Sequence, residues 1–516
     1  MNGKFTDKLT NVALWLDRRL HLTKLWETTA GHHVPKSSGS WFYTFGSMTL
    51  LCFVIQIVTG IVLALIYIPS AAEAYRSLEY LNYQQPLGWF MRALHYWGAN
   101  CMVVIMVLHM AQVFLWGAYK YPRELTWISG VVLLFLTLGL AFSGQVLRFD
   151  ADSYWGIGIG AAILGRVPFI GAQLVDVLLG GPIIGSDTLS RFFALHVFVL
   201  PGGILALLSI HLRLVLSKGI NEYPKPGVQV RRKTYDAEYE EMVQKDGVPF
   251  VPGAINKDLV ANGLLLIVMV LLAIFLGPNG PHTPGDPTQT ISEAKPDYPF
   301  LWLLSAAALL PNGSEVMLFM VFPLIATTIL FALPFISNEG EKSWRRRPIA
   351  VMTVILVFLT VTMLTYAGLT GPWSPRMEAW TSYASKPEFI KARTPLELQG
   401  ALVLQDKQCR NCHAIGGLGG QRGPDLSAVG ARLTAPELVR QVIQGGGNMP
   451  AYGKNLSPEE TRALVAYLVS LRPPNSAPAQ EAIGPLKPQK EPTNKAPQAD
   501  STGSKSGKDL ATTDQR

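Results

Sequence analysis

The sequence predicts an all-α fold: a polytopic membrane bundle of about seven spanning helices, with a small all-α domain outside the membrane. Three observations predict it. The 516 residues are 49% hydrophobic and only 16% charged, a balance typical of a membrane protein with a polar part attached. Seven apolar stretches each approach the ~20 residues that cross the hydrocarbon core. Basic residues are concentrated in alternate loops and explain most of the net charge of +8, which is therefore no sign of nucleic-acid binding.

The first element is a cytoplasmic amphipathic segment, residues 1–44. Basic and apolar residues are interspersed over its first 25 positions, as in a helix that lies on a membrane surface. The basic residues are Lys4, Lys8, Arg18, Arg19 and Lys24, and the apolar ones are Phe5, Leu9, Val12, Leu16 and Leu20.

Seven spanning helices follow in two groups, four in a domain at 45–220 and three in a domain at 221–370. We expect them at residues 45–68, 93–115, 126–147, 190–215, 259–276, 314–336 and 349–368. A further apolar stretch, 300–310, is too short to span the bilayer and is expected to lie on its surface or dip into it.

The distribution of lysine and arginine predicts the orientation. With the N-terminus in the cytoplasm, the inner segments hold 20 of these residues and the outer segments hold 6. This asymmetry agrees with the positive-inside rule. An odd number of crossings then places the C-terminal part of the chain outside the membrane.

Two of the expected helices carry two histidines each, His95 with His109 and His196 with His211. Spacings of 14 and 15 residues keep each helix's histidines on one face and about 21 to 23 Å apart. Imidazole is a good iron ligand, and polar side chains at bilayer depth are costly and usually functional. We therefore predict that the helices clamp two haems, one between His95 and His196 and one between His109 and His211. The alternative is that they are hydrogen-bonded core histidines.

Glycines in two neighbouring helices repeat this spacing. Gly46 and Gly60 are 14 residues apart, and so are Gly130 and Gly144. Glycine lets a bulky group approach the backbone, so these positions would leave room for the edges of the macrocycles. The alternative is that they line helix–helix contacts, as glycines in membranes often do.

The chain changes character after the last spanning helix. A linker (371–393) leads to a small helical domain (394–472). Thr394 and Ser457 each precede a helix with proline at its first position and a capping glutamate at its third. Residues 473–516 are rich in Pro, Lys, Ala, Gln and Ser and are expected to be disordered.

Cys409, Cys412 and His413 form the C-x-x-C-H signature of covalent c-type haem attachment. The rival interpretations are a redox cysteine pair or half of a zinc site, but this domain holds no second Cys or His cluster that would complete a zinc site. Met449, the only methionine between residues 378 and 516, is expected to be the sixth iron ligand; its alternative role is packing. Haem attachment to such a motif takes place outside the cytoplasm, which agrees with the predicted topology.

Residues from about 5 to 472 resemble the cytochrome b of quinol:cytochrome c oxidoreductases (the bc1/b6f family), joined to a class I cytochrome c. The histidine and glycine spacings carry the resemblance, together with longer motifs. These motifs are Pro122-Arg123-Glu124-Leu125-Thr126-Trp127, Arg191-Phe192-Phe193, Leu195-His196-x-Phe198-Val199-Leu200-Pro201 and Arg346-Arg347-Pro348. The longer histidine gap looks more like the b6f branch, whose polypeptide is split in two where this one is continuous. Fusion to a cytochrome c suggests a bacterial version.

The resemblance implies roles for the histidines according to depth. His95 and His196 would hold an outer, lower-potential haem b, and His109 and His211 an inner, higher-potential one. Arg92 resembles the family's partner for a haem propionate. An arginine that snorkels to the membrane interface is the equal alternative for this residue.

Family members oxidise quinol, here menaquinol or ubiquinol, at the outer face beside a Pro-Glu-Trp-Tyr loop. The matching text is Pro296-Asp297-Tyr298-Pro299, so the resemblance implies that Asp297 accepts a quinol proton, with Tyr298 beside it in the catalytic site. Asp297 between prolines is also a good turn residue. Two departures stand out. Arg148 replaces a proline near the quinol pocket, and Thr44 replaces the cysteine that holds an extra haem in the b6f branch, so no such haem is expected.

The implied function is that of the cytochrome b and c subunit of a proton-translocating quinol:cytochrome c oxidoreductase in a bacterial inner membrane. One quinol electron would go to an iron–sulfur protein and on to the haem c, and the other through both haems b to an inner quinone. The chain has no Rieske ligand set, so a separate Rieske protein is implied, with a further cytochrome c or terminal acceptor and a homodimeric assembly. Two alternatives stay open: a dihaem conduit without bifurcation, and an assembly scaffold with structural haems.

Overall fold

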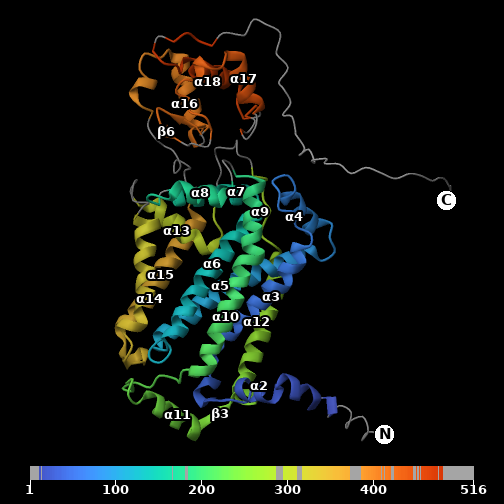
Figure 1. Ribbon diagram of the computed structural model, residues 1–516, viewed down its shortest axis with the longest axis vertical. Coiled ribbons are helices and arrows are strands. Elements are labelled where there is room, and N and C mark those ends of the chain that lie inside the picture. Colours follow the sequence, from blue (N-terminus) through green and yellow to red (C-terminus); the bar gives the residue numbers. More distant parts are fainter. Residues whose placement is uncertain are drawn as a thin grey trace, which may run out of the picture.

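The computed structural model describes residues 11–12, 14–165, 167–180, 184–285, 295–310, 317–371, 385–407, 409–411, 413–419, 423–445, 449, 452–453, 455–474 and 476–479. Seven helices in this part of the chain are long and apolar enough to cross a membrane. They stand side by side, and a smaller helical unit lies beyond one end of them (Figure 1). The predicted all-α membrane architecture is confirmed.

Each spanning helix covers a stretch that the sequence predicts to span. They are α3 (Phe45–Ala64), α5 (Gly88–Leu115), α6 (Glu124–Val146), α9 (Ser186–Ala194) continued by α10 (Leu200–Lys218), α12 (Ile255–Leu276), α14 (Phe322–Ile336) and α15 (Pro348–Thr370). Three of these spans include a π-helical turn, which lies at Leu195–Val199, Phe250–Ala254 and Met317–Val321.

Short helices cover the two ends of the bundle (Figure 1). At one end, called the α7 end below, lie α4 (Ala74–Tyr83), α7 (Ala151–Gly165), α8 (Gly171–Leu179) and α13 (Tyr298–Leu309). At the other, called the α11 end, lie α2 (Leu22–Thr29) and α11 (Tyr235–Asp246). The 12-residue α13 packs against α15 and, as predicted, is too short to span a bilayer.

Three small antiparallel pairings complete the regular structure. They join β1 (His33–Pro35) to β3 (Gly247–Pro249), β2 (Gln229–Val230) to β4 (Gly340–Glu341), and β5 (Ala414–Ile415) to β6 (Leu418–Gly419). The first two pairings tie the N-terminal segment and the loops together at the α11 end. The 3-10 turns are Lys36–Gly39, Trp41–Tyr43, Trp344–Arg346, Pro387–Phe389, Cys409–Asn411 and Val429–Ala431.

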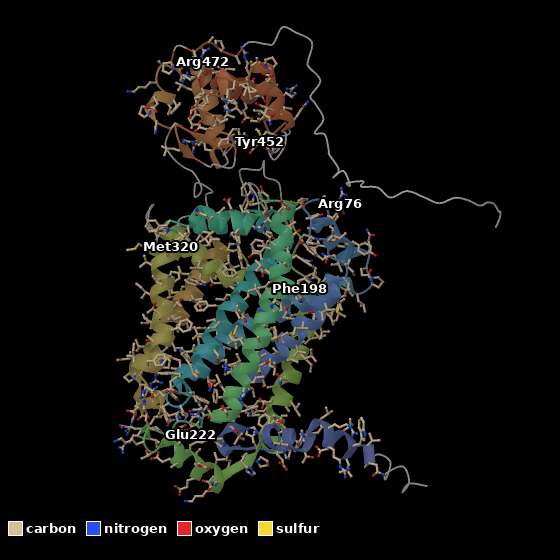
Figure 2. All side chains as sticks on the ribbon, viewed as in Figure 1. Arg76, Phe198, Glu222, Met320, Tyr452 and Arg472 are labelled. Atoms are coloured by element: carbon tan, nitrogen blue, oxygen red, sulfur yellow. The ribbon has the colours of Figure 1, made fainter. Side chains whose placement is uncertain are left out.

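The spanning helices expose apolar side chains on their flanks. Val58, Phe198 and Phe275 are 57%, 66% and 76% exposed, and Figure 2 labels Phe198 about half-way along the bundle. Such an apolar surface is stable only against lipid, which also requires the backbone to satisfy its own hydrogen bonds, as helices do. The interior of the bundle holds a separate apolar cluster of Cys52, Phe53, Met102, Ile105, Leu133, Ile204, Leu265 and Met269.

The smaller unit is built on α16 (Pro395–Asp406), α17 (Ala435–Gln444) and α18 (Pro458–Ser470). Both predicted capping boxes are present, because Thr394 and Ser457 each exchange hydrogen bonds with the glutamate three residues on. The helices enclose a core that includes Val403, Leu438, Leu464 and Leu468. Most of the predicted linker and nearly all of the predicted tail lie outside the described residues.

Candidate functional site

The histidines meet in pairs between α5 and the α9–α10 span. The rings of His95 and His196 have centroids 6.3 Å apart, and this pair, called the α7-side pair, lies toward the α7 end. His109 and His211 are close enough to interact electrostatically and form the α11-side pair. The structure therefore brings together the same partners that the sequence predicts.

One glycine faces each histidine. A Cβ atom added at Gly144 would lie 2.9 Å from Cε1 of His196, and one added at Gly60 would lie 3.3 Å from Cε1 of His95. At the α11-side pair the corresponding distances are 3.6 Å, from Gly46 to His109, and 3.5 Å, from Gly130 to His211.

These pockets fit a flat metal macrocycle. Two metal–nitrogen bonds of about 2 Å each, with the ring radii added, place facing imidazole centroids about 6 Å apart, as His95 and His196 are. The four glycines supply the clearance that a side chain would remove. The donor set, two neutral imidazoles per site, is the one that low-spin haem proteins of electron transfer use.

Hydroxyl groups fix the tautomer of three of the histidines. Nδ1 of His95, His211 and His196 lies 2.8, 2.8 and 3.0 Å from the hydroxyls of Thr59, Ser129 and Ser143. Each hydroxyl donates its own proton to a carbonyl of its helix, so its oxygen accepts from the Nδ1–H group. Nε2 of these histidines is thereby left with a free lone pair for a metal.

The fourth histidine differs. Nδ1 of His109 is buried and has no hydrogen-bond partner among the residues that the structure describes. Thr59, Ser129 and Ser143 each directly precede a glycine that faces a histidine, whereas Phe45 precedes Gly46. The hydroxyls are functional candidates that sequence reasoning missed, and the only signal was this Ser/Thr–Gly pairing.

A π-helical turn reconciles the unequal histidine spacings. The turn at Leu195–Val199 contains His196 and ends at Leu200, whose N–H bonds the carbonyl five residues back. Pro201 has no N–H with which to continue the α-helical ladder. The turn absorbs one residue, so the 15-residue gap to His211 acts as the 14-residue gap of the partner helix.

Arg92 lies at the α7 end, as expected for a residue near the α7-side pair. Its guanidinium donates to the Asn82 side chain at 3.0 Å and to the backbone carbonyls of Asn279 and Gly280. It thus ties α5 to the segment after α12. These partners support a positioning role, and its contact with a propionate stays a prediction.

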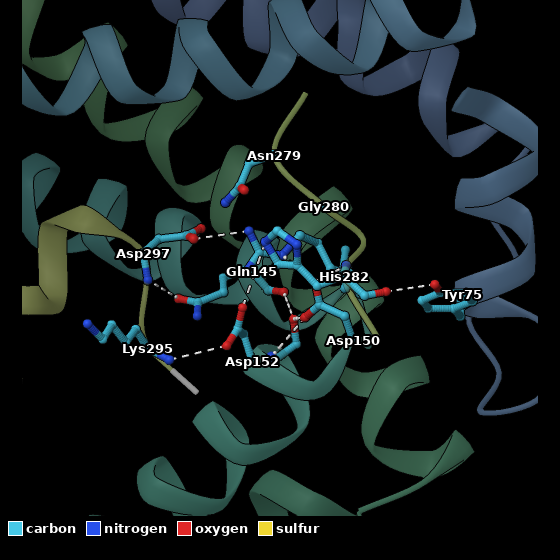
Figure 3. A network of polar contacts seen from close by, with 12 residues as sticks. Tyr75, Gln145, Asp150, Asp152, Asn279, Gly280, His282, Lys295 and Asp297 are labelled. Carbon is cyan, nitrogen blue, oxygen red and sulfur yellow. Dashed lines mark hydrogen bonds and ion pairs between the residues drawn. The ribbon is translucent and has the colours of Figure 1, made fainter. Parts of the chain in front are cut away.

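Asp297 stands at the N-cap of α13 and is held against the end of α6 (Figure 3). Its N–H donates to Oε1 of Gln145 at 3.1 Å, and Arg148 donates to Oδ1 at 3.0 Å. Arg148 also forms an ion pair with Asp150 at 3.4 Å. Asp150 is fully buried and accepts hydrogen bonds from the N–H and Oγ of Ser153.

The charge state of Arg148 follows from these neighbours. Burial alone lowers its pKa, but the charges of Asp297 and Asp150 outweigh burial and raise the pKa above its ordinary value. One arginine therefore compensates two carboxylates. A third, Asp152, accepts from the Lys295 N–H at 3.2 Å, and burial together with the charge of Asp150 raises its pKa. This end of the bundle is rich in proton-accepting oxygen atoms.

Tyr298, predicted beside Asp297, points elsewhere. Its hydroxyl donates to the carbonyl of Asn100 on α5 at 2.9 Å, and burial raises its pKa. It links α13 to α5, and among the described residues its hydroxyl forms no hydrogen bond with the Asp297 carboxylate. Its role in catalysis stays a prediction.

A buried acid–base pair near the α11-side pair was missed by sequence reasoning. Lys257 and Asp258, in the first turn of α12, form an ion pair at 2.9 Å with side chains only 9% and 10% exposed. Ser47 donates to the other oxygen of Asp258 at 2.8 Å, and Ser47 follows Gly46, which faces His109. The available signal was a Lys–Asp dipeptide at the head of an otherwise apolar helix.

A second charged network closes the α11 end, where Glu222 lies in Figure 2. Lys342 donates to Glu222 at 2.6 Å, and Tyr235 links Glu222 to Arg123 through bonds of 2.9 and 2.7 Å. Burial raises the pKa of Glu222, but the charges of Lys342 and Arg123 outweigh burial and lower it. Burial lowers the pKa of Lys342 to about 8.

In the smaller unit, two of the residues predicted to hold haem c, Cys409 and Met449, pack against the same apolar core. His413 donates from Nδ1 to the carbonyl of Pro424 at 2.8 Å, which leaves Nε2 available for iron. Met449 accepts a bond from Gln441 at its sulfur and packs, like Cys409, against the core of the unit. Cys412 lies outside the described residues.

Three family models match the chain. "Cytochrome b/b6/petB" matches residues 31–219, "Cytochrome b(C-terminal)/b6/petD" matches 284–385, and "Cytochrome C oxidase, cbb3-type, subunit III" matches 398–468.

Known relatives and a solved structure agree with the matches to the cytochrome b family models. Cytochrome b6 of Synechococcus sp. (strain JA-3-3Ab) is 38% identical over 41% of this chain and 99% of its own length. The "Menaquinol:cytochrome c reductase cytochrome b subunit" of Bacillus subtilis (strain 168) is 38% identical over 41% of this chain and 98% of its own. A chain of a "Hyperthermophilic respiratory Complex III" superposes with a TM-score of 0.59 at 30% identity, covering 71% of this chain and 93% of that chain.

Proposed function

The chain belongs to the cytochrome b/b6 family and carries a cytochrome c domain at its C-terminal end, and from this premise we propose that it is the cytochrome b and c subunit of a quinol:cytochrome c oxidoreductase. The proposed reaction oxidises a quinol at the α7 end, reduces a quinone at the α11 end and moves protons across the membrane. A separate Rieske protein, a further cytochrome c or terminal acceptor and a homodimer complete the proposal. The α7 end and the cytochrome c domain face the outside.

The histidine pairs hold two non-covalent haems b in this proposal, and Cys409, Cys412, His413 and Met449 hold one covalent haem c. When bound, these groups supply one-electron carriers on both routes from the quinol. The protein's own contribution is to fix the imidazoles at the right separation and tautomer. The glycine clearances and the hydroxyls of Thr59, Ser129 and Ser143 support this assignment.

The position of Asp297 is the observation that best supports quinol oxidation at the α7 end. Quinol oxidation releases protons, so the site needs a base within hydrogen-bond reach of the substrate hydroxyl. The Asp297 carboxylate is 20% exposed, is fixed by Gln145 and Arg148, and lies at the same end of the bundle as the α7-side pair. Oδ2 of Asp297 is left to meet a quinol hydroxyl while Oδ1 holds Arg148.

At the α11 end, the Lys257–Asp258 pair is the proposed proton source for quinone reduction. A quinone that takes up electrons must also take up protons, and a buried carboxylate beside a lysine delivers them without exposing the site to bulk water. The bond from Ser47 fixes the carboxylate close to His109. This assigns opposite proton chemistry to the two ends of the bundle.

Replacement of the Asp297 carboxylate tests the α7-end site. In the purified complex, Asp297→Asn should slow quinol oxidation about a hundredfold, the range of a lost general base, with haem content unchanged. Asp297→Glu should retain most of the rate. Asp176→Asn, which alters an exposed carboxylate on α8, is the control. Unaltered quinol oxidation in Asp297→Asn contradicts the proton role.

Bifurcation is tested by adding oxidant. Bifurcation means that the two electrons of one quinol take different routes from the α7 end. A pulse of oxidised acceptor, added to the complex with excess quinol, should then oxidise the c-type absorbance. The same pulse should drive the b-type absorbance toward the reduced state. A conduit without bifurcation predicts that both absorbances are oxidised together, and this result would replace the proposal by the conduit. Loss of the iron–sulfur signal from an active complex would do the same.

A further inference from the structure

Unequal hydrogen bonding divides the four imidazoles. Both members of the α7-side pair donate from Nδ1, His95 to Thr59 and His196 to Ser143. In the α11-side pair only His211 donates, to Ser129. His109, as described above, has no partner for Nδ1 in the part of the chain that the structure covers.

This difference has a known chemical consequence. Donation from Nδ1–H moves electron density onto Nε2 and makes the imidazole a stronger base toward iron. A stronger donor favours ferric over ferrous iron and so lowers the reduction potential, since hydrogen bonding behind an axial ligand is one of the means by which a protein sets that potential. An imidazole without such a bond has the opposite effect.

We infer that the missing hydroxyl behind His109, at the position that Phe45 occupies, is what gives the α11-side haem the higher of the two potentials that the resemblance implies. The inference rests on the proposed haem sites. It gives electron transfer from the α7 end to the α11 end a downhill direction although all four ligands are histidines. It also makes Phe45, Thr59, Ser129 and Ser143 positioning residues that act on iron through the imidazoles.

The helix geometry supports the assignment to Phe45. Thr59 and Ser143 stand one residue before glycines whose added Cβ atoms would approach Cε1 of the facing histidine, and Phe45 stands one residue before Gly46, whose added Cβ would lie 3.6 Å from Cε1 of His109. A hydroxyl at position 45 would therefore occupy the corresponding place. The side chain of Gln112, a turn beyond His109, is within reach of a weak hydrogen bond to this imidazole, although Nδ1 has no partner of normal geometry among the described residues, so Gln112 needs its own control.

The decisive variants are a matched pair at position 45. Phe45→Thr and Phe45→Val have nearly the same shape and differ by one hydroxyl. Redox titration of the b-type absorbance should show that Phe45→Thr lowers the α11-side midpoint relative to Phe45→Val by about tenfold in the equilibrium constant, which is 59 mV for one electron. The α7-side midpoint should stay fixed in both variants.

The converse change is made at the α7-side pair. Ser143→Ala removes the partner of His196 and should raise the α7-side midpoint by a similar factor, whereas Ser143→Thr keeps a hydroxyl and should leave it unchanged. Gln112→Leu should move neither midpoint. Electron paramagnetic resonance of the ferric state reports the same change in ligand strength without turnover.

The results separate two failures. Equal α11-side midpoints in Phe45→Thr and Phe45→Val, an unmoved α7-side midpoint in Ser143→Ala, or a shift in Gln112→Leu would each overturn the inference while leaving the proposed function in place. A wild-type protein with fewer than two b-type components would overturn the haem assignment itself.

Discussion

The two histidine pairs are built by the same helices on the same plan, yet they differ in detail. Added Cβ atoms would approach the α7-side imidazoles to 2.9 and 3.3 Å but the α11-side imidazoles only to 3.5 and 3.6 Å. Both α7-side imidazoles donate to hydroxyls, and one α11-side imidazole does not. Both pairs consist of histidines, so the two sites differ in the residues that lie behind the imidazoles.

The charged groups at the two ends differ in the same manner. At the α7 end one guanidinium, that of Arg148, serves both Asp150 and Asp297. At the α11 end Glu222 has Lys342 and, through Tyr235, Arg123, while Asp258 has its own lysine. Two carboxylates at the α7 end therefore share one cation, whereas Glu222 and Asp258 at the α11 end each have a cation of their own.

Removing Arg148, the cation that Asp150 and Asp297 share, should have the largest effect on stability. Arg148→Met leaves the buried Asp150 uncompensated and should lower the free energy of unfolding by about 4 kcal/mol, read from thermal unfolding in detergent. Arg76→Met, whose ion pair with Glu73 is exposed, should cost under about 0.5 kcal/mol. Equal losses in the two variants would show that the α7 end does not depend on its one arginine.

At the α11 end, the contribution of the Glu222–Lys342 ion pair to stability should depend on pH. The folded-state pKa of Glu222 lies below the ordinary value of 4.5, so the contribution of the pair is complete above pH 4.5 and is lost as the pH falls through the folded-state value. Glu222→Gln should lose about 3 kcal/mol of stability at pH 7, and its deficit relative to wild type should shrink toward pH 3. Thermal unfolding across this pH range measures it; a deficit independent of pH contradicts the ion pair.

The unequal clearances predict unequal tolerance of a methyl group. Gly144→Ala places Cβ 2.9 Å from the His196 ring and should cost about 2 kcal/mol as overpacking, with partial loss of the α7-side haem. Gly130→Ala makes an ordinary contact at 3.5 Å and should bind a full complement. Pyridine haemochrome assay per polypeptide gives the comparison, and the reverse order of haem loss would refute it.

The smallest expected effect concerns delivery of protons. Asp258→Asn should slow reoxidation of the b-type absorbance by added quinone about tenfold, because water replaces part of a lost proton donor. Asp246→Asn, an exposed carboxylate at the end of α11, is the control. If Asp258→Asn slowed quinol oxidation but left reoxidation of the b-type absorbance normal, Asp258 would act at the α7 end, and the proposed role at the α11 end would be wrong.

The sequence predicts the spanning helices and the pairing of the histidines because both follow from local rules: apolar length sets a span, and residue spacing sets depth and face. The hydroxyls behind the histidines could not be predicted in this way. A serine or threonine in an apolar helix normally bonds its own backbone, and Ser129 and Ser143 do so here. The second bond, to a histidine, is indicated in the sequence only by the glycine that follows each hydroxyl residue.

The charged site was only partly predictable for a different reason. Asp297 and Arg148 are 149 residues apart in sequence, and their pairing depends on how α13 meets the end of α6. The resemblance to known proteins supplied Asp297, but neither the role of Asp150 as the second partner nor the direction of Tyr298 follows from a motif. Buried ion pairs are decided by tertiary packing, which local patterns do not encode.

Between Gly371, which follows α15, and Ser385, where description of the chain resumes, lie 13 residues. Even fully extended, this tether reaches only about 50 Å, so the redox domain at its end is confined to a few hundred thousand cubic ångströms and meets the bundle at a millimolar effective concentration. Under the proposed function, electron transfer to this domain is therefore unimolecular, and its rate does not depend on the concentration of the protein. Each membrane bundle is thereby made with one cytochrome c domain of its own, in a fixed one-to-one ratio.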